Sequence, residues 1–360
     1  MSQHVIRGRG CLTRSNVATL LEALHVRKPL LVCGARMADV FRSRTGMEWP
    51  VFSGYHPNPD LADSVAGVQM YRAQGCDGLI SLGGGSAMDT AKAIKALLLT
   101  GDMARVRSSD LTADVWLPHM AIPGTAGTGS EATPFAVVYV DGRKLSLDHP
   151  ALLPEAVVLD GSLLTTLPDH HRKACAMDAL AQGIESFWAK KAMEDSRVHA
   201  VRAIRGVLDN IDRYIAGDAA AQDALLEAAY ESGVAIATSR TTAAHAMSYG
   251  LTKRLGYAHG HACMLTLPHL WRLALTDAQV RPVQERLAGE LGLTRPEELA
   301  ERMLALLDKL SLTVEVPQDA QLLADLASTV NVQRLGNHPQ ALTDEQLRRV
   351  YALALRMEKA

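Results

Sequence analysis

Disulfide-forming cysteine pairs, long apolar runs and a charge excess of one sign are all missing from this sequence. Its five cysteines are scattered, odd in number and never spaced as CxxC, so we expect a reduced, cytoplasmic protein. No apolar run approaches the roughly 18 residues of a transmembrane helix, and the first residues lack the apolar run of a signal peptide. The net charge of −2 gives no reason to expect a nucleic acid as a partner.

The chain is long enough for two domains, since it has 360 residues, of which 48% are hydrophobic. Its first part alternates short apolar segments with helical ones. We predict strands at 29–34, 49–52, 77–82, 119–122 and 156–160, helices at 37–44, 61–74 and from the Gly83 turn to 99, and a hairpin at 135–147. This alternation predicts an α/β domain over residues 1–165 with a mostly parallel, Rossmann-like sheet.

After Leu167-Pro168-Asp169 the sequence changes to long Ala-, Leu- and Met-rich segments with helical periodicity. We predict helices at 170–192, 195–215, 219–237, 240–256, 260–275, 281–291, 296–310, 319–329 and 343–358. The second domain, residues 166–360, is therefore expected to be all-helical.

Two glycine-rich turns lie in the first domain. The strand Asp77–Leu82 runs into Gly83-Gly84-Gly85-Ser86 and then into a helix, where bare amides and the helix dipole can hold a pyrophosphate. A tight turn that needs glycine for a positive φ explains the same residues without a ligand. A second turn, Gly124-Thr125-Ala126-Gly127-Thr128-Gly129, follows another predicted strand.

The second domain contains a candidate metal site. Asp178 and Gln182 are four residues apart, on one face of a helix, and His245 and His259 lie in later segments. A carboxylate, an amide and two imidazoles from separate helices could close on one divalent ion, and such donors suit iron(II) or zinc better than magnesium. The alternative is that two of the 13 histidines fall here by chance.

Together and in this order, the two turns and the histidine pair resemble the iron-dependent (group III) alcohol dehydrogenases, and the resemblance covers nearly the whole chain. It implies that family's fold, which is dehydroquinate synthase-like: a dinucleotide-binding α/β domain followed by an all-α domain for metal and substrate. It also implies an NAD(P)-dependent alcohol dehydrogenase or aldehyde reductase with one divalent metal, Fe(II) or Zn(II), and commonly a homodimer.

The resemblance assigns cofactor contacts residue by residue. The matching positions are Gly84, Gly85 and Ser86 for the pyrophosphate, Thr125, Thr128 and Thr133 for the nicotinamide and its ribose, the family lysine Lys144, and Asn58 for the adenosine half. The residue after the first predicted strand separates NAD from NADP, because an acidic side chain there repels a 2′-phosphate. This chain has Gly34 there, with Arg36 two residues on, so we expect NADPH rather than NADH. A turn glycine and a solvated arginine are the alternative.

The family holds its metal with one aspartate and three histidines. Asp178, His245 and His259 match three of these ligands, but Gln182 stands where a histidine is usual. Its neutral amide oxygen is a weaker ligand, so Gln182 could ligate weakly, be replaced by water, or mark a lost site. We expect a retained but weaker site. Tyr249 also departs from the family pattern, and it could relay a proton or only pack.

Cations near the histidines suggest an anionic substrate. Arginine binds a carboxylate, phosphonate or sulfonate through two parallel hydrogen bonds, although each cation could also be a surface residue. The candidates are Arg240, Lys253, Arg254 and Arg334, with Arg240 favoured because it lies five residues before His245.

These cations extend the resemblance to one branch of the family. Together with Gln182, the segments Arg240-Thr241-Thr242, Ser248-Tyr249, His259-Gly260-His261 and Arg334-Leu335-Gly336-Asn337 resemble the phosphonoacetaldehyde reductase (2-hydroxyethylphosphonate dehydrogenase) branch, which serves phosphonate biosynthesis. The competing hypotheses are a generic aliphatic alcohol dehydrogenase, a dehydroquinate-synthase-like cyclase and a non-catalytic nucleotide sensor.

Overall fold

The computed structural model describes residues 3–108, 110–111 and 116–357. The chain forms two compact units. One comprises Met1–Leu167 and Gly217–Gly233, and the other comprises Pro168–Ala216 and Val234–Ala360. Helix α8 (Ala219–Ser239) crosses the division, since its first residues belong to the first unit and its last residues to the second.

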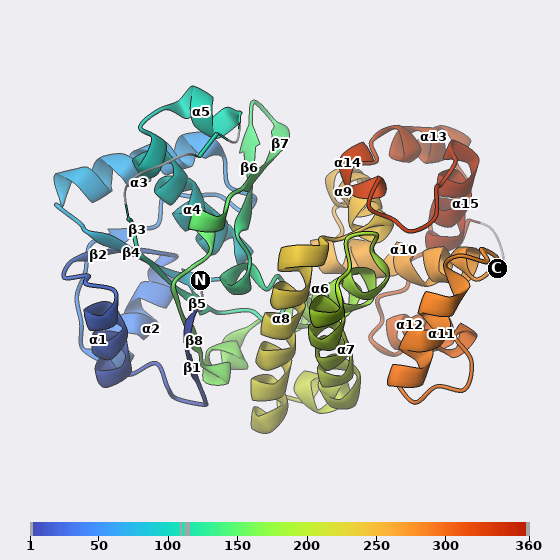
Figure 1. Cartoon of the computed structure of the whole chain (residues 1–360), viewed down its shortest axis with the longest axis horizontal. Helices are drawn as coiled ribbons and strands as arrows, with labels where there is room; N and C mark the ends of the chain where they lie inside the picture. The colour runs from blue at the N-terminus through green and yellow to red at the C-terminus, as the bar shows by residue number, and fades with distance from the viewer. Residues whose placement is uncertain (1–2, 109, 112–115, 358–360) are drawn as a thin grey trace. The chain divides into compact units, whose positions relative to one another are not determined.

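A six-stranded sheet forms the centre of the first unit (Figure 1). The strand order is β1-β8-β5-β4-β2-β3, and every neighbouring pair is parallel, which confirms the predicted parallel sheet. The strands are β1 His4–Arg7, β2 Pro29–Cys33, β3 Val51–Phe52, β4 Gly78–Gly83, β5 His119–Pro123 and β8 Ala156–Leu159. Strand β1, which is too short to stand out in the sequence, forms one edge beside β8.

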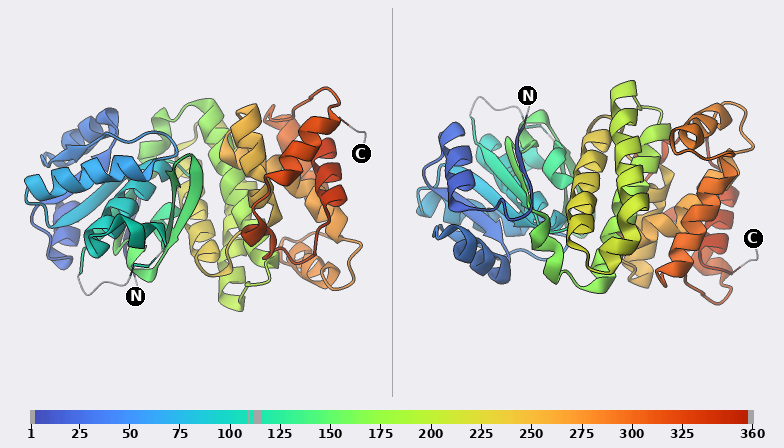
Figure 2. Two further views of the ribbon diagram at one scale, coloured as in Figure 1. Left: turned by 90° about the horizontal axis from the view of Figure 1, so that it is seen from above. Right: turned by 90° about the horizontal axis from the view of Figure 1, so that it is seen from below.

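Helices cover both faces of this sheet (Figure 2). They are α1 Arg14–Ala23, α2 Ala35–Thr45, α3 Leu61–Ala73 and α4 Gly85–Thr100. Because side chains alternate along a strand, Leu30 and Leu79 pack in the core with α3 and α4, whereas Leu31 and Ile80 pack in the core with α1 and α2. Burial on both faces explains why these strands are apolar throughout rather than alternating.

The predicted hairpin is present as an antiparallel pair, β6 (Phe135–Val140) and β7 (Arg143–Asp148). Asp141 and Gly142 both have positive φ, 50° and 72°, as a type I′ turn requires. The remaining elements of the first unit are short: α5 Met103–Arg107, η1 Ser130–Ala132, η2 Pro150–Leu152 and η3 Gly161–Thr166.

The second unit is helical in its described residues, as predicted. Its helices are α6 Asp169–Trp188, α7 Glu194–Ile215, α9 Ala243–Leu255, α10 His259–Ala274, α11 Arg281–Glu290, α12 Glu297–Lys309, α13 Ala320–Ser328, α14 Val332–Leu335 and α15 Asp344–Ala354. Helix α10 is buried along most of its length and packs against α6, α9, α12 and α15. The metal candidates therefore lie on helices that surround a buried central one.

The helix predicted at 240–256 begins later than expected, at Ala243. Arg240 lies before it with a left-handed φ of 63°. The reason is tertiary: the Asn337 side chain donates to the carbonyls of Ser239 and Thr241, at 2.8 and 3.0 Å, and so holds this connection out of helical geometry.

Among the helices that the structure describes, none combines the length and apolar character needed to cross a bilayer.

Candidate metal centre and nucleotide-binding turns

Helix α6 presents one buried polar face. Asp178, Gln182 and Glu185 lie on it at intervals of four and three residues, and all three are buried. Helix α10 comes very close to this face, because Gly260 has no side chain. A Cβ there would lie 2.1 Å from the carbonyl oxygen of Ala174 and 2.5 Å from Cβ of Asp178.

Glu185 positions His245 and the start of α9. Its Oε1 accepts hydrogen bonds from Thr242 N at 3.0 Å, Thr242 Oγ1 at 2.6 Å and Ala244 N at 2.9 Å, so this carboxylate satisfies the bare amides at the helix N-terminus. Its Oε2 bonds to Nδ1 of His245. The imidazole then presents its other nitrogen, Nε2, to Asp178 Oδ1 at 3.4 Å. Such a carboxylate–histidine pair is the usual support of a metal-binding imidazole.

His259 reaches the same carboxylate from α10. Its Nε2 lies 3.8 Å from Asp178 Oδ1, and its Nδ1 lies 3.3 Å from the hydroxyl of Ser248. Because Ser248 Oγ donates to the carbonyl of His245, its lone pairs can accept from Nδ1–H of His259. Nε2 is then left as the lone-pair nitrogen of this ring too. The His259 side chain is 42% exposed, so the cluster is open on its side.

Cys263 completes the cluster. Asp178, His245, His259 and Cys263 each offer a ligand atom, and these four atoms all lie within 4.8 Å of one another. The structure therefore brings together Asp178, His245 and His259 of the predicted metal residues and adds a thiol, while Gln182 is buried on the same face of α6, four residues after Asp178. The signal for that thiol was its position one helical turn after His259, and the signal for Glu185 was its place on the Asp178 face of α6.

The charges of the cluster support one another. Burial opposes the charged form of Asp178, but His259 and His245 outweigh that effect and lower the pKa of the carboxyl. Burial likewise raises the pKa of the Cys263 thiol, yet the same two imidazoles reverse the shift and bring it down to about 6. Positive charge beside Asp178 and Cys263 therefore favours the anionic forms of both groups.

The residues fit a divalent ion. Asp178 Oδ1 and His245 Nε2 are buried atoms without a hydrogen-bond partner among the described residues, and both point into the cluster. An unpaired buried carboxylate oxygen and imidazole nitrogen cost free energy unless a ligand satisfies them. Carboxylate, imidazole and thiolate are all zinc and iron ligands.

The predicted cations divide into two groups. Arg334, on α14, donates from Nη1 to Thr241 Oγ1 at 3.0 Å; burial lowers its pKa, while Glu185, Cys263 and Asp178 act to raise it. Arg240 is close enough to lower that pKa further, and its Nη1 donates to the carbonyl of Ala237 at 2.9 Å. The other group lies at the surface.

Lys253 and Arg254 form that surface group, at the end of α9. Arg254 pairs with Asp325 at 2.7 Å, and Lys253 lies over the ring of Tyr249, 5.8 Å from its centroid. Tyr249 itself is half-buried, one turn after His245. The structure thus brings Arg334 nearer to the candidate metal ligands than the sequence suggested. Arg254, by contrast, pairs with Asp325 at the surface.

In the first unit, the two glycine-rich turns lie against each other at the carboxyl ends of β4 and β5. Gly84 is the N-cap of α4, and the amide of Gly124 donates to the carbonyl of Gly83 at 2.7 Å. A Cβ on Gly84 would lie 3.2 Å from Thr125, and one on Gly85 would lie 3.0 Å from Thr128. The α4 N-terminus is therefore bare backbone framed by two threonines, which suits an anionic phosphate.

The other predicted cofactor residues surround these turns. The amide of Asn58 lies 3.4 Å from Ser86 Oγ, so these two candidates are neighbours. Thr133 is buried, and Lys92 Nζ donates to its carbonyl and hydroxyl as well as to Ser130 and Phe135. Lys92 thus holds the segment that follows the second turn. Lys144 lies on β7 opposite Tyr139 and interacts electrostatically with Asp89.

Gly34 occupies the point where the strand order reverses. The chain passes from β2 outward to β3 and then back to β4 on the other side of β2. The crevice outside the carboxyl ends of strands at such a point is the usual ligand site of open α/β sheets. Gly34 caps α2 there without a side chain, and Arg36 is exposed in the first turn of that helix.

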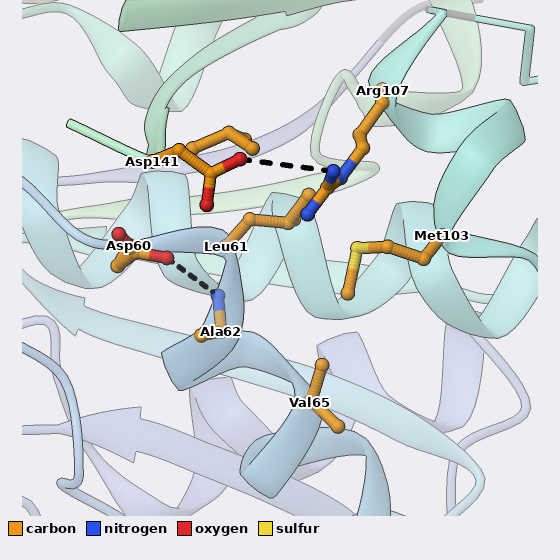
Figure 3. Close-up of a pocket in the computed structure, with 8 residues that line it drawn as sticks. Asp60, Leu61, Ala62, Val65, Met103, Arg107 and Asp141 are labelled. Carbon is orange, nitrogen blue, oxygen red and sulfur yellow. Dashed lines mark hydrogen bonds and ion pairs between the residues drawn. The ribbon is translucent and has the colours of Figure 1, made fainter. Parts of the chain in front are cut away.

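A separate hollow of about 310 Å³ lies between the start of α3, α5 and the tip of the hairpin (Figure 3). Leu61, Val65 and Met103 give it an apolar lining, and Arg107 pairs with Asp141 at 3.9 Å at its edge. None of the glycine-rich turn residues is among its described lining residues.

Comparison with known proteins places this geometry in a family. The model of iron-containing alcohol dehydrogenases matches residues 2–161, and that of the C-terminal part of the Fe-containing alcohol dehydrogenase family matches residues 173–355. Phosphonoacetaldehyde reductase of Streptomyces viridochromogenes is 36% identical over 328 residues, which are 84% of this chain and 83% of that protein.

Solved structures of the same family are similar to this chain over nearly its whole length. Sulfoacetaldehyde reductase from Bifidobacterium kashiwanohense, in complex with NAD+, has a TM-score of 0.90 at 27% identity and covers 99% of this chain and 98% of its own. An iron-containing alcohol dehydrogenase from Thermotoga maritima has a TM-score of 0.85 at 26% identity, with the same coverage of 99% and 98%.

Proposed function

Because this chain belongs to the iron-containing alcohol dehydrogenase family, and is therefore an oxidoreductase of alcohols and aldehydes, we propose that its substrate is a small aldehyde bearing an anionic group. The reaction we propose is the NAD(P)H-dependent reduction of phosphonoacetaldehyde to 2-hydroxyethylphosphonate. Two of the similar proteins named above are reductases of phosphonoacetaldehyde and sulfoacetaldehyde. Both names describe a two-carbon aldehyde with a tetrahedral oxyanion at its far end.

The observation that carries this proposal is a pair of neighbouring arginines, one of which lies close to a candidate metal ligand. Arg334 interacts electrostatically with Asp178 and also with Arg240, which precedes His245 by five residues. Two neighbouring guanidinium groups repel each other, and partial burial of Arg334 weakens its solvation; an anion between them relieves both effects. A phosphonate or sulfonate has the charge and the oxygen atoms to do so.

For the metal we propose Asp178, His245 and His259 as ligands. A divalent ion held there supplies a Lewis acid for the carbonyl oxygen, and a reduced nicotinamide supplies the hydride. Glu185 keeps Nε2 of His245 turned toward the ion, and Arg240 holds the anionic end of the aldehyde. Tyr249 is our candidate for relaying the proton to the product oxygen, because its phenol lies one helical turn from His245.

For the nucleotide we propose the α/β domain over residues 1–165 and a preference for NADPH. The bare N-terminus of α4 at Gly84 and Gly85 suits the pyrophosphate. At the switch point, Gly34 leaves room for a 2′-phosphate, and the cation Arg36 follows in the first turn of α2.

The test compares Arg240→Ala with the unchanged enzyme on phosphonoacetaldehyde and on propanal, a neutral aldehyde. Loss of a charge-assisted, bidentate hydrogen-bonded contact should lower kcat/KM for the phosphonate by about 30- to 1,000-fold, equivalent to roughly 2–4 kcal/mol of transition-state binding. The rate on propanal should change little. Arg349→Ala, which removes an exposed cation of α15, serves as the matched control.

Cofactor oxidation is followed by absorbance. An equal loss on both aldehydes would mean that Arg240 is structural, and a generic aliphatic alcohol dehydrogenase would become the better description. Conversion of a phosphorylated sugar without net cofactor oxidation would instead favour a cyclase.

A further inference from the structure

We propose that Cys263 is the fourth protein ligand of the metal site, so that one carboxylate, two imidazoles and one thiolate hold the ion. This inference rests on the metal site of the proposed function, and it changes the ligand set expected from the sequence. There, the fourth position fell to the amide of Gln182.

Three separations between the ligand atoms can be compared with those of a tetrahedral site. In a zinc site with nitrogen and oxygen donors at about 2.0–2.1 Å and sulfur at about 2.3 Å, neighbouring donors lie about 3.4 Å apart, or about 3.6 Å when one is sulfur. Here Asp178 Oδ1 lies 3.4 Å from His245 Nε2 and 3.8 Å from His259 Nε2. Sγ of Cys263 lies 4.0 Å from His259 Nε2, and no pair among the four donors exceeds 4.8 Å.

Helix geometry places the thiol on the correct side. Cys263 follows His259 by one turn of α10, so both side chains lie on the face that α10 turns toward α6 and α9. The thiol is fully buried, and its sulfur lies 4.0 Å from Nε2 of His259 and within 4.8 Å of the ligand atom of His245. It therefore contacts both imidazole ligands, as a group in a shared coordination shell must.

The polar atoms around the thiol indicate that a cation lies among them, because the thiol alone does not satisfy them. Asp178 Oδ1 and His245 Nε2 lie 3.4 Å apart in the buried cluster, and neither atom has a hydrogen bond of good geometry to a described residue. A thiol is a weak hydrogen-bond donor and could satisfy only one of them poorly. An ion at the centre of the four donors satisfies both atoms at once and neutralises the thiolate.

Donor chemistry also favours the thiolate over the amide of Gln182. A neutral amide oxygen suits hard ions such as calcium and magnesium, whereas thiolate and imidazole bind zinc, cobalt and cadmium strongly. Of the other cysteines, Cys175 also lies on α6, interacts electrostatically with Tyr214 on α7, and is not one of the four grouped donors. Cys175→Ser is therefore the matched control for Cys263→Ser.

The experiment uses cobalt(II), because a cobalt–thiolate bond gives a charge-transfer absorption in the near ultraviolet that oxygen and nitrogen donors do not. The full-length metal-free enzyme is titrated with cobalt(II), and bound metal is counted in parallel. We expect one ion per chain and the thiolate band in the unchanged enzyme and in Cys175→Ser. In Cys263→Ser the band should vanish and metal affinity should fall at least about tenfold, since even an outer hydrogen-bond partner of a ligand is worth that much.

A second variant distinguishes loss of the thiolate ligand from misfolding of Cys263→Ser. Adding Gln182→His should restore cobalt binding to Cys263→Ser by supplying a third imidazole, but it should not restore the thiolate band. One bound cobalt ion without a thiolate band in the unchanged enzyme would overturn the role of Cys263 and leave the metal site intact. So would a band that persists in Cys263→Ser. No bound cobalt at all would overturn the metal site itself, and this proposal with it.

Discussion

At the scale of single residues, the orientation of His245 in the proposed metal site depends on a carboxylate that is not one of the proposed ligands. Glu185 holds Nδ1 of His245 and the first amides of α9 at the same time. Glu185→Gln keeps the shape but removes the charge and one acceptor. We expect metal affinity to fall about 10- to 100-fold, because the imidazole loses its orientation and some of its basicity.

Competition with a chelator measures this loss of affinity. Glu194→Gln is the control, since that carboxylate is exposed and pairs with Arg286 at the surface. Unchanged affinity in Glu185→Gln would mean that the packing around His245 is sufficient to orient it.

At the scale of elements, the approach of α10 to α6 depends on Gly260. In Gly260→Ala the new methyl group would lie 2.1 Å from the carbonyl oxygen of Ala174, so the helices must separate. We expect a loss of about 1–3 kcal/mol in the free energy of unfolding, as for other overpacked sites, together with weaker metal binding. Both ends of the cluster, Asp178 and His259, move apart when these helices do.

Gly289→Ala is the control for this substitution. A Cβ at Gly289, on α11, meets nothing within 4 Å, so alanine there should stabilise the helix by up to about 1 kcal/mol. Denaturant unfolding and metal titration of both variants separate crowding at the α6–α10 contact from a general effect of alanine.

The turn between β2 and α2 is the element that we expect to set the preference between NADPH and NADH. A side chain at Gly34 meets nothing within 4 Å, and aspartate is a favourable N-cap, so Gly34→Asp should leave the fold intact. Its charge opposes a 2′-phosphate, and we expect kcat/KM to shift toward NADH by about tenfold or more. Steady-state rates with both cofactors check this. Equal preference in the unchanged enzyme would contradict the choice of NADPH.

At the scale of the whole molecule, stability should fall as the pH rises from about 5 to about 8 because of Glu131. Burial raises the pKa of this carboxyl from 4.5 to about 7, and its Oε1 has no partner among the described residues. The unfolded chain thus releases this proton near pH 4.5, and the folded protein near pH 7. Between these values the folded state binds more protons, so rising pH favours unfolding, by on the order of 2 kcal/mol.

Glu131→Gln imitates the protonated carboxyl and should remove this part of the pH dependence. Calorimetry should find the variant more stable than the unchanged protein at about pH 8, with a smaller difference at about pH 5. Glu22→Gln, at an exposed position of α1, should leave the profile unchanged. A constant difference between Glu131→Gln and the unchanged protein would show that Glu131 does not ionise in this range.

The sequence by itself determined the features that depend on neighbours along the chain. Continuous apolar segments predicted the buried parallel strands, and the segment around Asp141-Gly142 predicted the hairpin, because the positive φ that both residues adopt in its turn is a local requirement. Asp178 and Gln182 were placed on one helical face for the same reason. The resemblance to a family, carried by the glycine turns and the histidines, supplied the order of the domains and the choice of His245 and His259.

Only the tertiary structure decided which side chains complete the cluster. Cys263 and Glu185 join it because α6, α9 and α10 meet at Gly260, a contact that no spacing along one helix reveals. Arg240 lies before α9, although the helix was predicted to begin at this residue, because a distant amide, that of Asn337, binds the connection before α9. Arg334 reaches the same connection from α14 near the C-terminus. Hydrogen bonds and contacts between segments far apart in the chain depend on packing, and local sequence patterns do not encode their geometry.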